Sequence, residues 1–202
     1  MSDTLPQRKN LRYSGYDYRK AGAYFVTICI EDGLALLGRA VGETITCSEA
    51  GTMVMEVWQS IPDAFSNVTL DQFVVMPNHL HFVIWLRGEP LAGRASTPSR
   101  QDDVVEKPPA LPDVMQWFKS LTTAKYREGV YQRNWPAYPG RLWQRSYYEH
   151  VVRSDAALFA IRQYIQANPK RWHLDRYHPN PVGQDEEAMA LWQLLRSEGT
   201  PI

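Results

Sequence analysis

Two histidines at alternate positions are the first residues in this sequence whose types and spacing could do chemistry. His79 and His81 lie in the run HLHFVIWL (79–86), whose aromatic and branched side chains are typical of a strand. Residues two apart on a strand point to the same face, about 7 Å apart along the backbone. Neutral imidazole is a common ligand of divalent metal ions, and two such ligands leave open positions. The pair predicts a metal site, although two polar residues on a solvated strand face would give the same pattern.

A tyrosine and an asparagine form a second candidate pair. Tyr164 and Asn168 are four residues apart in an expected helix, so they lie on one face, one turn from each other. Pro169 disfavours helical geometry at Asn168 and leaves its carboxamide at the helix end. An oxygen there could complete a metal site, with a phenol one turn back. The alternatives are a tyrosine that packs between helix and sheet and an asparagine that only ends the helix.

These residues need elements that bring them together, and the chain alternates between strand-like and helical segments. The expected strands and helices, in order, are strand 23–30, helix 49–60, strands 70–76 and 79–86, helix 113–127, strand 142–152 and helix 155–168. Two short apolar pieces after Gly33 predict a small hairpin, and a last amphipathic helix is expected near 186–195. A β-α-β-β-α-β order predicts an α+β, ferredoxin-like (split βαβ) antiparallel sheet with helices packed on one face.

Composition limits the class of protein. The chain has 202 residues, 44% of them hydrophobic, which suffices for one compact domain. No apolar run reaches 18 residues, so no membrane span is expected, and the N-terminus lacks a hydrophobic signal core. Two cysteines, Cys29 and Cys47, fit a reducing cytoplasm. We expect a cytoplasmic protein with a basic arm at 1–22, a catalytic domain at 23–170 with a flexible insertion at 87–112, and a tail with a short helix at 171–202.

The net charge is zero, but the charges are unevenly distributed. Residues 1–20 carry +3 and residues 111–180 carry +6, whereas 21–110 carry −6 and 181–202 carry −3. A basic second half could form a face that binds phosphate groups. Ordinary surface charge explains the same distribution equally well.

Four ordered motifs together resemble a known family. They are GAYFVT (22–27), MPNHLH (76–81), WQRSYYEH (143–150) and YIQANP (164–169). The second resembles the His-hydrophobic-His motif of the single-tyrosine HUH transposases. The last is similar to a segment of their subfamily associated with repetitive extragenic palindromes (REPs), the REP-associated tyrosine transposases. The likeness runs from about residue 12 to residue 172.

The resemblance implies a fold, a reaction and roles for named residues. It implies that His79 and His81 bind Mg²⁺ or Mn²⁺ with Asn168 as the third ligand, and that Tyr164 is the nucleophile. Its attack on single-stranded DNA beside an imperfect palindromic hairpin would leave a 5′-phosphotyrosine and a free 3′-hydroxyl, which permits strand transfer. Tyr148 is the rival nucleophile, and the one-turn spacing to Asn168 favours Tyr164.

DNA contacts follow less directly from the same likeness. Phosphate-binding candidates are Arg8, Lys9 and Arg12 in the arm, and Lys119, Lys125, Arg127, Arg145 and Arg162 in the second half. Tyr147 and Tyr148 are candidates for stacking on unpaired bases, although core packing is the common role of a single aromatic residue.

Two other functions stay open on the sequence alone. A catalytically silent protein that recognises hairpin repeats would share the fold, and an unrelated metal hydrolase could use His79 and His81 with water. The intact set of four site residues favours the transposase, and we expect a monomer rather than a homodimer.

Overall fold

The structure, a computed structural model, describes residues 17–88 and 108–198. Its strands are β1 (Gly22–Cys29), β2 (Gly38–Val41), β3 (Thr44–Cys47), β4 (Val68–Val75), β5 (His79–Leu86) and β6 (Tyr148–Val152). Its α-helices are α1 (Glu49–Gln59), α2 (Ile61–Ala64), α3 (Leu111–Arg133), α4 (Asp155–Ala167) and α5 (Glu186–Ser197), and its 3₁₀ helices are η1 (Glu31–Gly33) and η2 (Asn168–Leu174).

The main sheet has the predicted topology. Its strand order is β4-β5-β1-β6, and all neighbouring pairs are antiparallel. With β1, β4, β5 and β6 counted as the four core strands, this is the 2-3-1-4 order of a ferredoxin-like fold, with α1 and α3 as its two crossover helices. β2 and β3 form the expected separate hairpin. The ferredoxin-like prediction is confirmed, and β5, which carries both histidines, is an inner strand.

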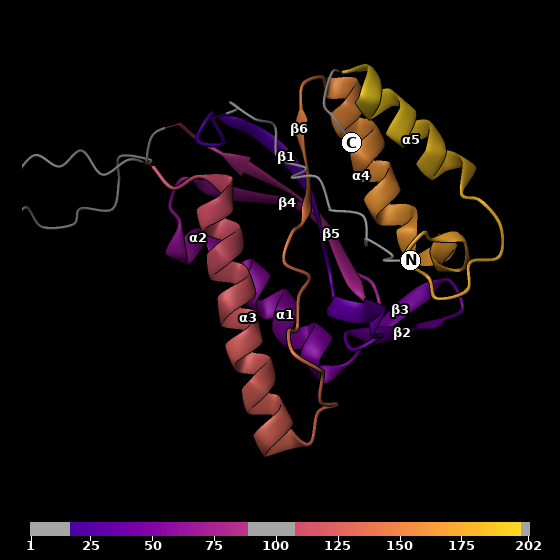
Figure 1. Ribbon diagram of the computed structural model, residues 1–202. Helices are drawn as coiled ribbons and strands as arrows, with labels where there is room; N and C mark the ends of the chain where they lie inside the picture. The colour runs from indigo at the N-terminus through magenta and orange to yellow at the C-terminus, as the bar shows by residue number, and fades with distance from the viewer. Residues whose placement is uncertain (1–16, 89–107, 199–202) are drawn as a thin grey trace, which may run out of the picture.

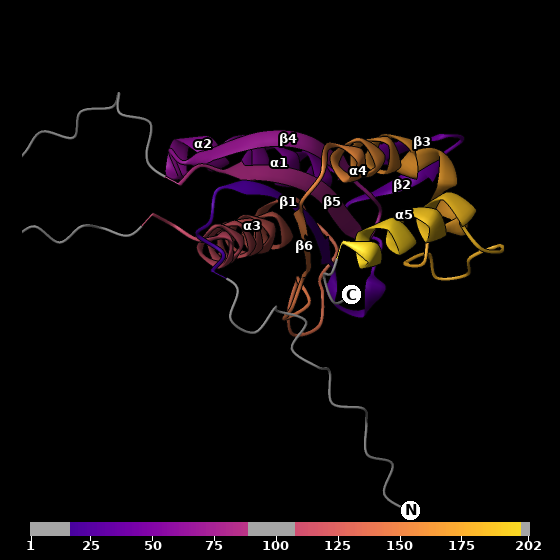
Figure 2. The ribbon, with the colours of Figure 1, turned by 90° about the horizontal axis from the view of Figure 1, so that it is seen from above.

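Helices cover both faces of this sheet (Figure 1). α1 and α3 lie on one side with the larger apolar core, and α4 and α5 lie on the other side with a second core. The sequence predicted helices on one face of the sheet. α1 and α3 lie on that face, and α4 and α5 cover the other face as well. β5 contributes apolar residues to both cores, Leu80 and Phe82 to the first and Val83 to the second, because it contains no charged residue. Seen from above, α5 runs beside α4 over the second face (Figure 2).

Two boundaries differ from the sequence expectation by more than two residues. α3 continues to Arg133 rather than ending near 127, and it passes through Gly129, where a Cβ would lie 2.2 Å from the Trp135 ring. Gly129 therefore allows a ring to pack against the helix instead of ending it. β6 begins at Tyr148 rather than at 142, because the chain before it makes only an isolated bridge between Trp143 and Ile30.

The remaining predictions about organisation concern the arm, the insertion and the domain boundaries. Most of the 1–22 arm, with Arg8, Lys9 and Arg12, and most of the 87–112 insertion lie outside the described residues. The boundaries of arm, catalytic domain and tail stay predictions. Within residues 17–88 and 108–198, no helix combines the length and apolar character needed to cross a membrane.

Candidate metal and nucleophile site

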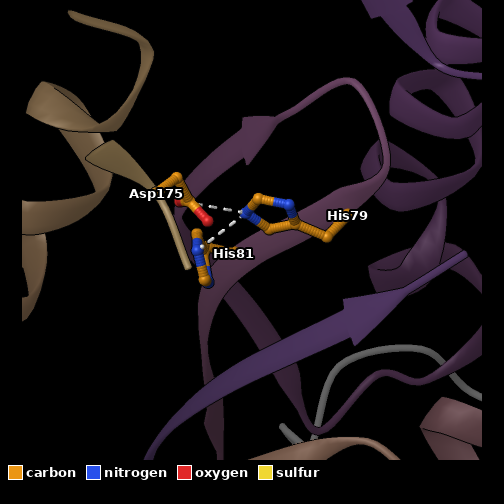
Figure 3. Close-up of side chains that lie close together, drawn as sticks. All are labelled: His79, His81 and Asp175. Carbon is orange, nitrogen blue, oxygen red and sulfur yellow. Dashed lines mark hydrogen bonds and ion pairs between the residues drawn. The ribbon is translucent and has the colours of Figure 1, made fainter. Parts of the chain in front are cut away.

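The two histidines lie side by side on β5 and face each other. The Nε2 atoms of His79 and His81 are 3.0 Å apart, and both side chains are fully buried. Figure 3 shows the two rings projecting from the strand toward a common point. Two ligands at right angles around an octahedral ion, each about 2.1 Å from it, would be about 3 Å apart. The spacing of these nitrogen atoms fits adjacent positions around one small divalent cation.

Asn78 fixes the orientation of the first ring. Its Nδ2 donates to the carbonyl oxygens of Gly33 and Tyr177, at 3.1 and 2.8 Å. Its Oδ1 therefore points to Nδ1 of His79, 2.8 Å away, and Nδ1 must carry the proton that it accepts. Nε2 of the neutral His79 ring is left as a lone pair that faces the site. Such a hydrogen bond to the distal nitrogen is the usual support of a metal-binding histidine.

Thr27 supports the second ring from the neighbouring strand. Its Oγ1 is 2.8 Å from Nδ1 of His81, and β1 pairs with β5 so that these two residues lie directly opposite each other. The threonine hydroxyl can accept from Nδ1–H, which leaves Nε2 of His81 free to bind a cation as well.

Asp175 completes a three-residue cluster that sequence reasoning missed. Its Oδ2 is 3.6 Å from Nε2 of His79, and ligand atoms of Asp175 and both histidines lie within 4.8 Å of one another. Asp175 follows η2 in the segment expected to be a tail, and Figure 3 shows it reaching the rings from that segment. Nothing in the spacing between 81 and 175 indicates this contact, because only the folding of η2 against the sheet creates it.

Asn168 lies at the predicted position beside the cluster. It is 2% exposed, and its side chain lowers the pKa values of both Tyr164 and Asp175, so it lies beside these two residues. Its Oδ1 has no hydrogen-bond partner among the residues that the structure describes. A buried acceptor without a partner costs about 1–3 kcal/mol, and amide oxygen is a suitable ligand for Mg²⁺ or Mn²⁺. The residues present therefore fit a hard divalent cation held by His79, His81, Asn168 and Asp175.

Tyr164 reaches the same cluster from α4. Its hydroxyl oxygen is 3.3 Å from Nε2 of His81, and its ring packs edge-on against Phe25. Ser154 begins α4 by accepting a hydrogen bond from the Ala157 amide, and the Arg162 guanidinium forms a bidentate pair with Asp71 of β4. These contacts hold α4 on the sheet with the tyrosine over the histidines.

Burial determines the protonation states in the site. Burial, assisted by the neighbouring imidazole and by Arg176, holds the pKa of His79 well below its ordinary value, and burial with Arg176 lowers the pKa of His81 to about 3. Both rings are therefore neutral at pH 7. Burial also raises the pKa of Tyr164 far above 10, with the Asp175 charge adding to it and the Asn168 hydrogen bond opposing it. A positive charge beside the phenol would be needed to make it a nucleophile.

Two of the predicted DNA contacts do not fit their positions. The Lys119 ammonium donates to the carbonyl oxygens of Gln144, at 2.9 Å, and Ser146, at 3.2 Å, so it supports the chain before β6. Tyr148, also the rival nucleophile, packs its ring edge-on against Phe25 and Trp192, with centroids 6.0 and 5.1 Å away. Its hydroxyl is buried, with no hydrogen-bond partner among the described residues, so neither stacking on DNA nor attack suits it here.

The other described candidates have varied surroundings. Arg162 is paired with Asp71, and Tyr147 is half-buried under the Lys119 ammonium, 5.2 Å from its ring centroid. Lys125, Arg127 and Arg145 are exposed and stay predictions for phosphate contacts.

A protein of Haemophilus influenzae, described as uncharacterized, is 32% identical to this chain over 178 residues. The match covers 86% of this chain and 94% of the relative. The chain belongs to the same family as this protein. No model of a known protein family matches the chain.

Two solved structures are more weakly similar to this chain. One is a protein of Deinococcus radiodurans R1 described as a candidate transposase, with 18% identity, a TM-score of 0.42, and coverage of 77% of this chain and 95% of that one. The other is the REP-associated tyrosine transposase bound to a REP hairpin, with 19% identity, a TM-score of 0.44, and coverage of 84% and 73%. Similarity at this level carries no argument about function, which has to come from the site itself.

Proposed function

We propose that this protein cleaves single-stranded DNA and transfers the cut strand, with Tyr164 as the nucleophile, as a REP-associated tyrosine transposase. The observation that carries the proposal is the 3.3 Å approach of the Tyr164 hydroxyl to His81, inside a buried group of residues suited to a divalent cation. The four sequence motifs support the same reaction, because two of them supply the histidines and the tyrosine–asparagine pair.

The reaction exchanges one phosphate ester for another. The Tyr164 oxygen attacks the phosphorus atom, the bond from phosphorus to the 3′-oxygen breaks, and a 5′-phosphotyrosine forms. The tyrosyl proton leaves to solvent, and the departing 3′-oxygen takes up a proton from solvent, so protons and charge balance over the step. A 3′-hydroxyl of another strand reverses the step. The ester energy is kept in the adduct, so no nucleotide cofactor is required.

The chain's own residues prepare a place for Mg²⁺ or Mn²⁺. His79, His81, Asn168 and Asp175 would hold the ion, and Asn78 and Thr27 keep the rings oriented for it. When bound, such an ion acts as a Lewis acid at the phosphate and stabilises negative charge on the reacting oxygens.

The proposed substrate is single-stranded DNA that carries an imperfect palindromic hairpin, and the proposed active form is a cytoplasmic monomer. Support for the monomer is that Tyr164 contacts a histidine of its own chain, so no partner helix is needed to complete the site. Exposed Lys125, Arg127 and Arg145 are the proposed phosphate contacts in the described part of the chain.

The test is covalent trapping. Purified protein, Mn²⁺ and a labelled library of hairpin-bearing single strands are mixed and separated on a denaturing gel. We expect a labelled protein band that disappears in Tyr164→Phe and persists in Tyr131→Phe, a matched change at an exposed tyrosine of α3.

Two other results would point elsewhere. Cleavage that survives Tyr164→Phe would indicate a metal hydrolase that uses water. Tight hairpin binding without any covalent band would indicate a catalytically silent DNA-binding protein.

A further inference from the structure

A cavity of about 330 Å³ adjoins the nucleophile on the side of α5. Tyr164 and Asp175 form part of its wall, and the loop before α5 and α5 itself form the rest. Pockets for small ligands begin at about 300 Å³, so this cavity is large enough to hold a ligand of the size of a single nucleotide. The proposed reaction uses Tyr164 and Asp175, but it does not explain the rest of this cavity.

Arg176 places a cation at the cavity. Its guanidinium carbon lies 5.0 Å from the Tyr177 ring centroid and 5.8 Å from that of Trp192, so two aromatic faces hold it. No carboxylate oxygen within the described parts of the chain lies at ion-pair distance from it, although the side chain is exposed. A guanidinium held in this way retains its hydrogen-bond donors for an anion, and phosphate is the anion that its fork matches.

The acidic residues of the cavity are already engaged. Asp185 caps α5 by accepting from the Ala188 amide and pairs with Arg171 at 3.1 Å. Asp175 faces His79. Neither carboxylate lies at ion-pair distance from Arg176, so its guanidinium stays available to an incoming phosphate.

The other walls are apolar. Leu174, Met189 and Trp192 line the cavity, and Met189 is 47% exposed. An exposed apolar wall next to a free cation suits a ligand with a flat apolar part and a negative charge. A nucleobase joined to a phosphate has both.

We propose that this cavity binds the nucleotide next to the bond that Tyr164 attacks, with the Arg176 guanidinium contacting its phosphate and the Met189–Trp192 wall contacting its base. That this nucleotide belongs to the DNA substrate rests on the proposed function, whereas the ability of the cavity to bind a nucleotide does not. Arg176 would then stabilise the charge that the phosphate gains during attack, a role worth about 10²–10³-fold in rate for a single donor.

The first test measures binding without divalent metal. The full chain is titrated with each of the four deoxynucleoside 5′-monophosphates and with inorganic phosphate, and binding is followed by calorimetry. We expect at least one monophosphate to bind saturably, more tightly than inorganic phosphate, and Arg176→Gln to weaken it at least about 10-fold. Arg141→Gln, at an exposed arginine outside the cavity, should leave the affinity unchanged. Absence of saturable binding, or equal affinity in wild type and Arg176→Gln, would overturn the proposal.

The second test separates this site from the proposed reaction. Tyr164→Phe should keep the monophosphate affinity while losing the covalent adduct. In the trapping assay Arg176→Gln should slow adduct formation about 10²-fold, and Arg176→Lys should restore part of the rate. Arg176-dependent binding with no adduct under any condition would refute the strand-transfer reaction and leave the nucleotide site standing. An adduct whose rate is the same in Arg176→Gln would refute the role of Arg176 in the reaction.

Discussion

At the residue scale, Asn78 orients the His79 ring so that its Nε2 can bind a metal ion. Its amide makes two donor bonds to backbone carbonyl groups, so only its oxygen is available to His79. Loss of a supporting residue of this kind typically lowers metal affinity about 10–100-fold. We expect Asn78→Ala to weaken Mn²⁺ binding by this factor, measured by electron paramagnetic resonance of free Mn²⁺.

Asn67 provides the matched control. It is 2% exposed, like Asn78, and its Nδ2 also donates to a backbone carbonyl, that of Pro109 at 3.3 Å, but it lies away from the histidines. Asn67→Ala should lower the melting temperature without lowering Mn²⁺ affinity. Equal losses of affinity in the two variants would mean that Asn78 acts only through general stability.

The buried histidines also predict how the stability of the metal-free protein depends on pH. Burial lowers the pKa of His79 and His81 in the folded state, whereas an unfolded histidine titrates near 6.5. Below pH 6.5 the unfolded chain takes up protons that the folded chain does not, so the free energy of unfolding falls as pH falls, by up to about 1.4 kcal/mol per pH unit for each histidine.

The Asp175 carboxyl changes the free energy of unfolding in the opposite direction as pH falls. Burial raises the pKa of its carboxyl to about 6, so between about pH 6 and 4 the folded chain takes up the proton first and gains stability. The expected net result is a loss of stability from pH 7 to 5, because the two histidines together outweigh the one carboxyl. Urea unfolding in metal-free buffers would measure it, and the double variant His79→Gln, His81→Gln should flatten the slope.

The sequence was informative about residues that lie in a local pattern. His79 with His81, and Tyr164 with Asn168, could be paired because strand and helix periodicity place each pair on one face, and the structure brings all four together. Asp175 could not be found, because a single aspartate 94 residues from His81 has no periodic relation to it. The charge of Lys119 suggested a phosphate contact, whereas the structure shows its ammonium donating to backbone carbonyl groups, which the sequence could not indicate.

At the element scale, the attachment of α4 to β4 decides where the nucleophile lies. Asp71 accepts both hydrogen bonds of the Arg162 guanidinium and a third from the Trp85 indole at 2.9 Å. We expect Asp71→Asn to loosen α4 by about 1 kcal/mol, because a charged bidentate pair that is partly exposed becomes a neutral contact. Hydrogen exchange of the α4 amides would show it as faster exchange.

Asp17→Asn is the control for that change. Asp17 forms an exposed pair with Arg19 at 3.6 Å, remote from α4 in the chain, so its loss should leave the α4 amides unchanged. Unchanged α4 exchange in Asp71→Asn would show that apolar packing alone holds the helix.

Element boundaries were predictable where capping residues mark them. Ser48 precedes the helix expected at 49–60, and its Oγ accepts from the Gly51 amide, so α1 begins where the sequence predicted it. The end of α3 was expected near 127 but lies at Arg133, because the packing of the Trp135 ring at Gly129 is a tertiary contact that the sequence pattern does not contain.

At the scale of the whole molecule, the sheet separates two cores with different consequences for the site. Phe118 of α3 belongs to the core on one face, and Trp192 of α5 belongs to the core that also contains Tyr164. Both Phe118→Ala and Trp192→Ala should lower the free energy of unfolding by about 3–5 kcal/mol. Only Trp192→Ala should also weaken Mn²⁺ binding, because it removes packing from the helix layer that carries the site.

Urea unfolding combined with a Mn²⁺ titration would measure both effects. Equal changes in Mn²⁺ affinity for the two variants would show that the cores are not independent with respect to the site. The amphipathic pattern of the sequence predicted the α5 helix but not its position over the sheet. Such a pattern indicates which face of a helix is apolar, but not which surface that face packs against.

The cluster draws its members from two distant parts of the described chain: the imidazoles come from an inner strand, and the amide and carboxylate come from 168 and 175, after the last strand. A cation bound by His79, His81, Asn168 and Asp175 would crosslink these two regions. By reciprocity, whatever releases the segment after β6 from the sheet must reduce cation affinity by the same factor by which the cation favours the attached state. Occupancy of this small centre would therefore report how firmly that C-terminal segment is attached to the sheet.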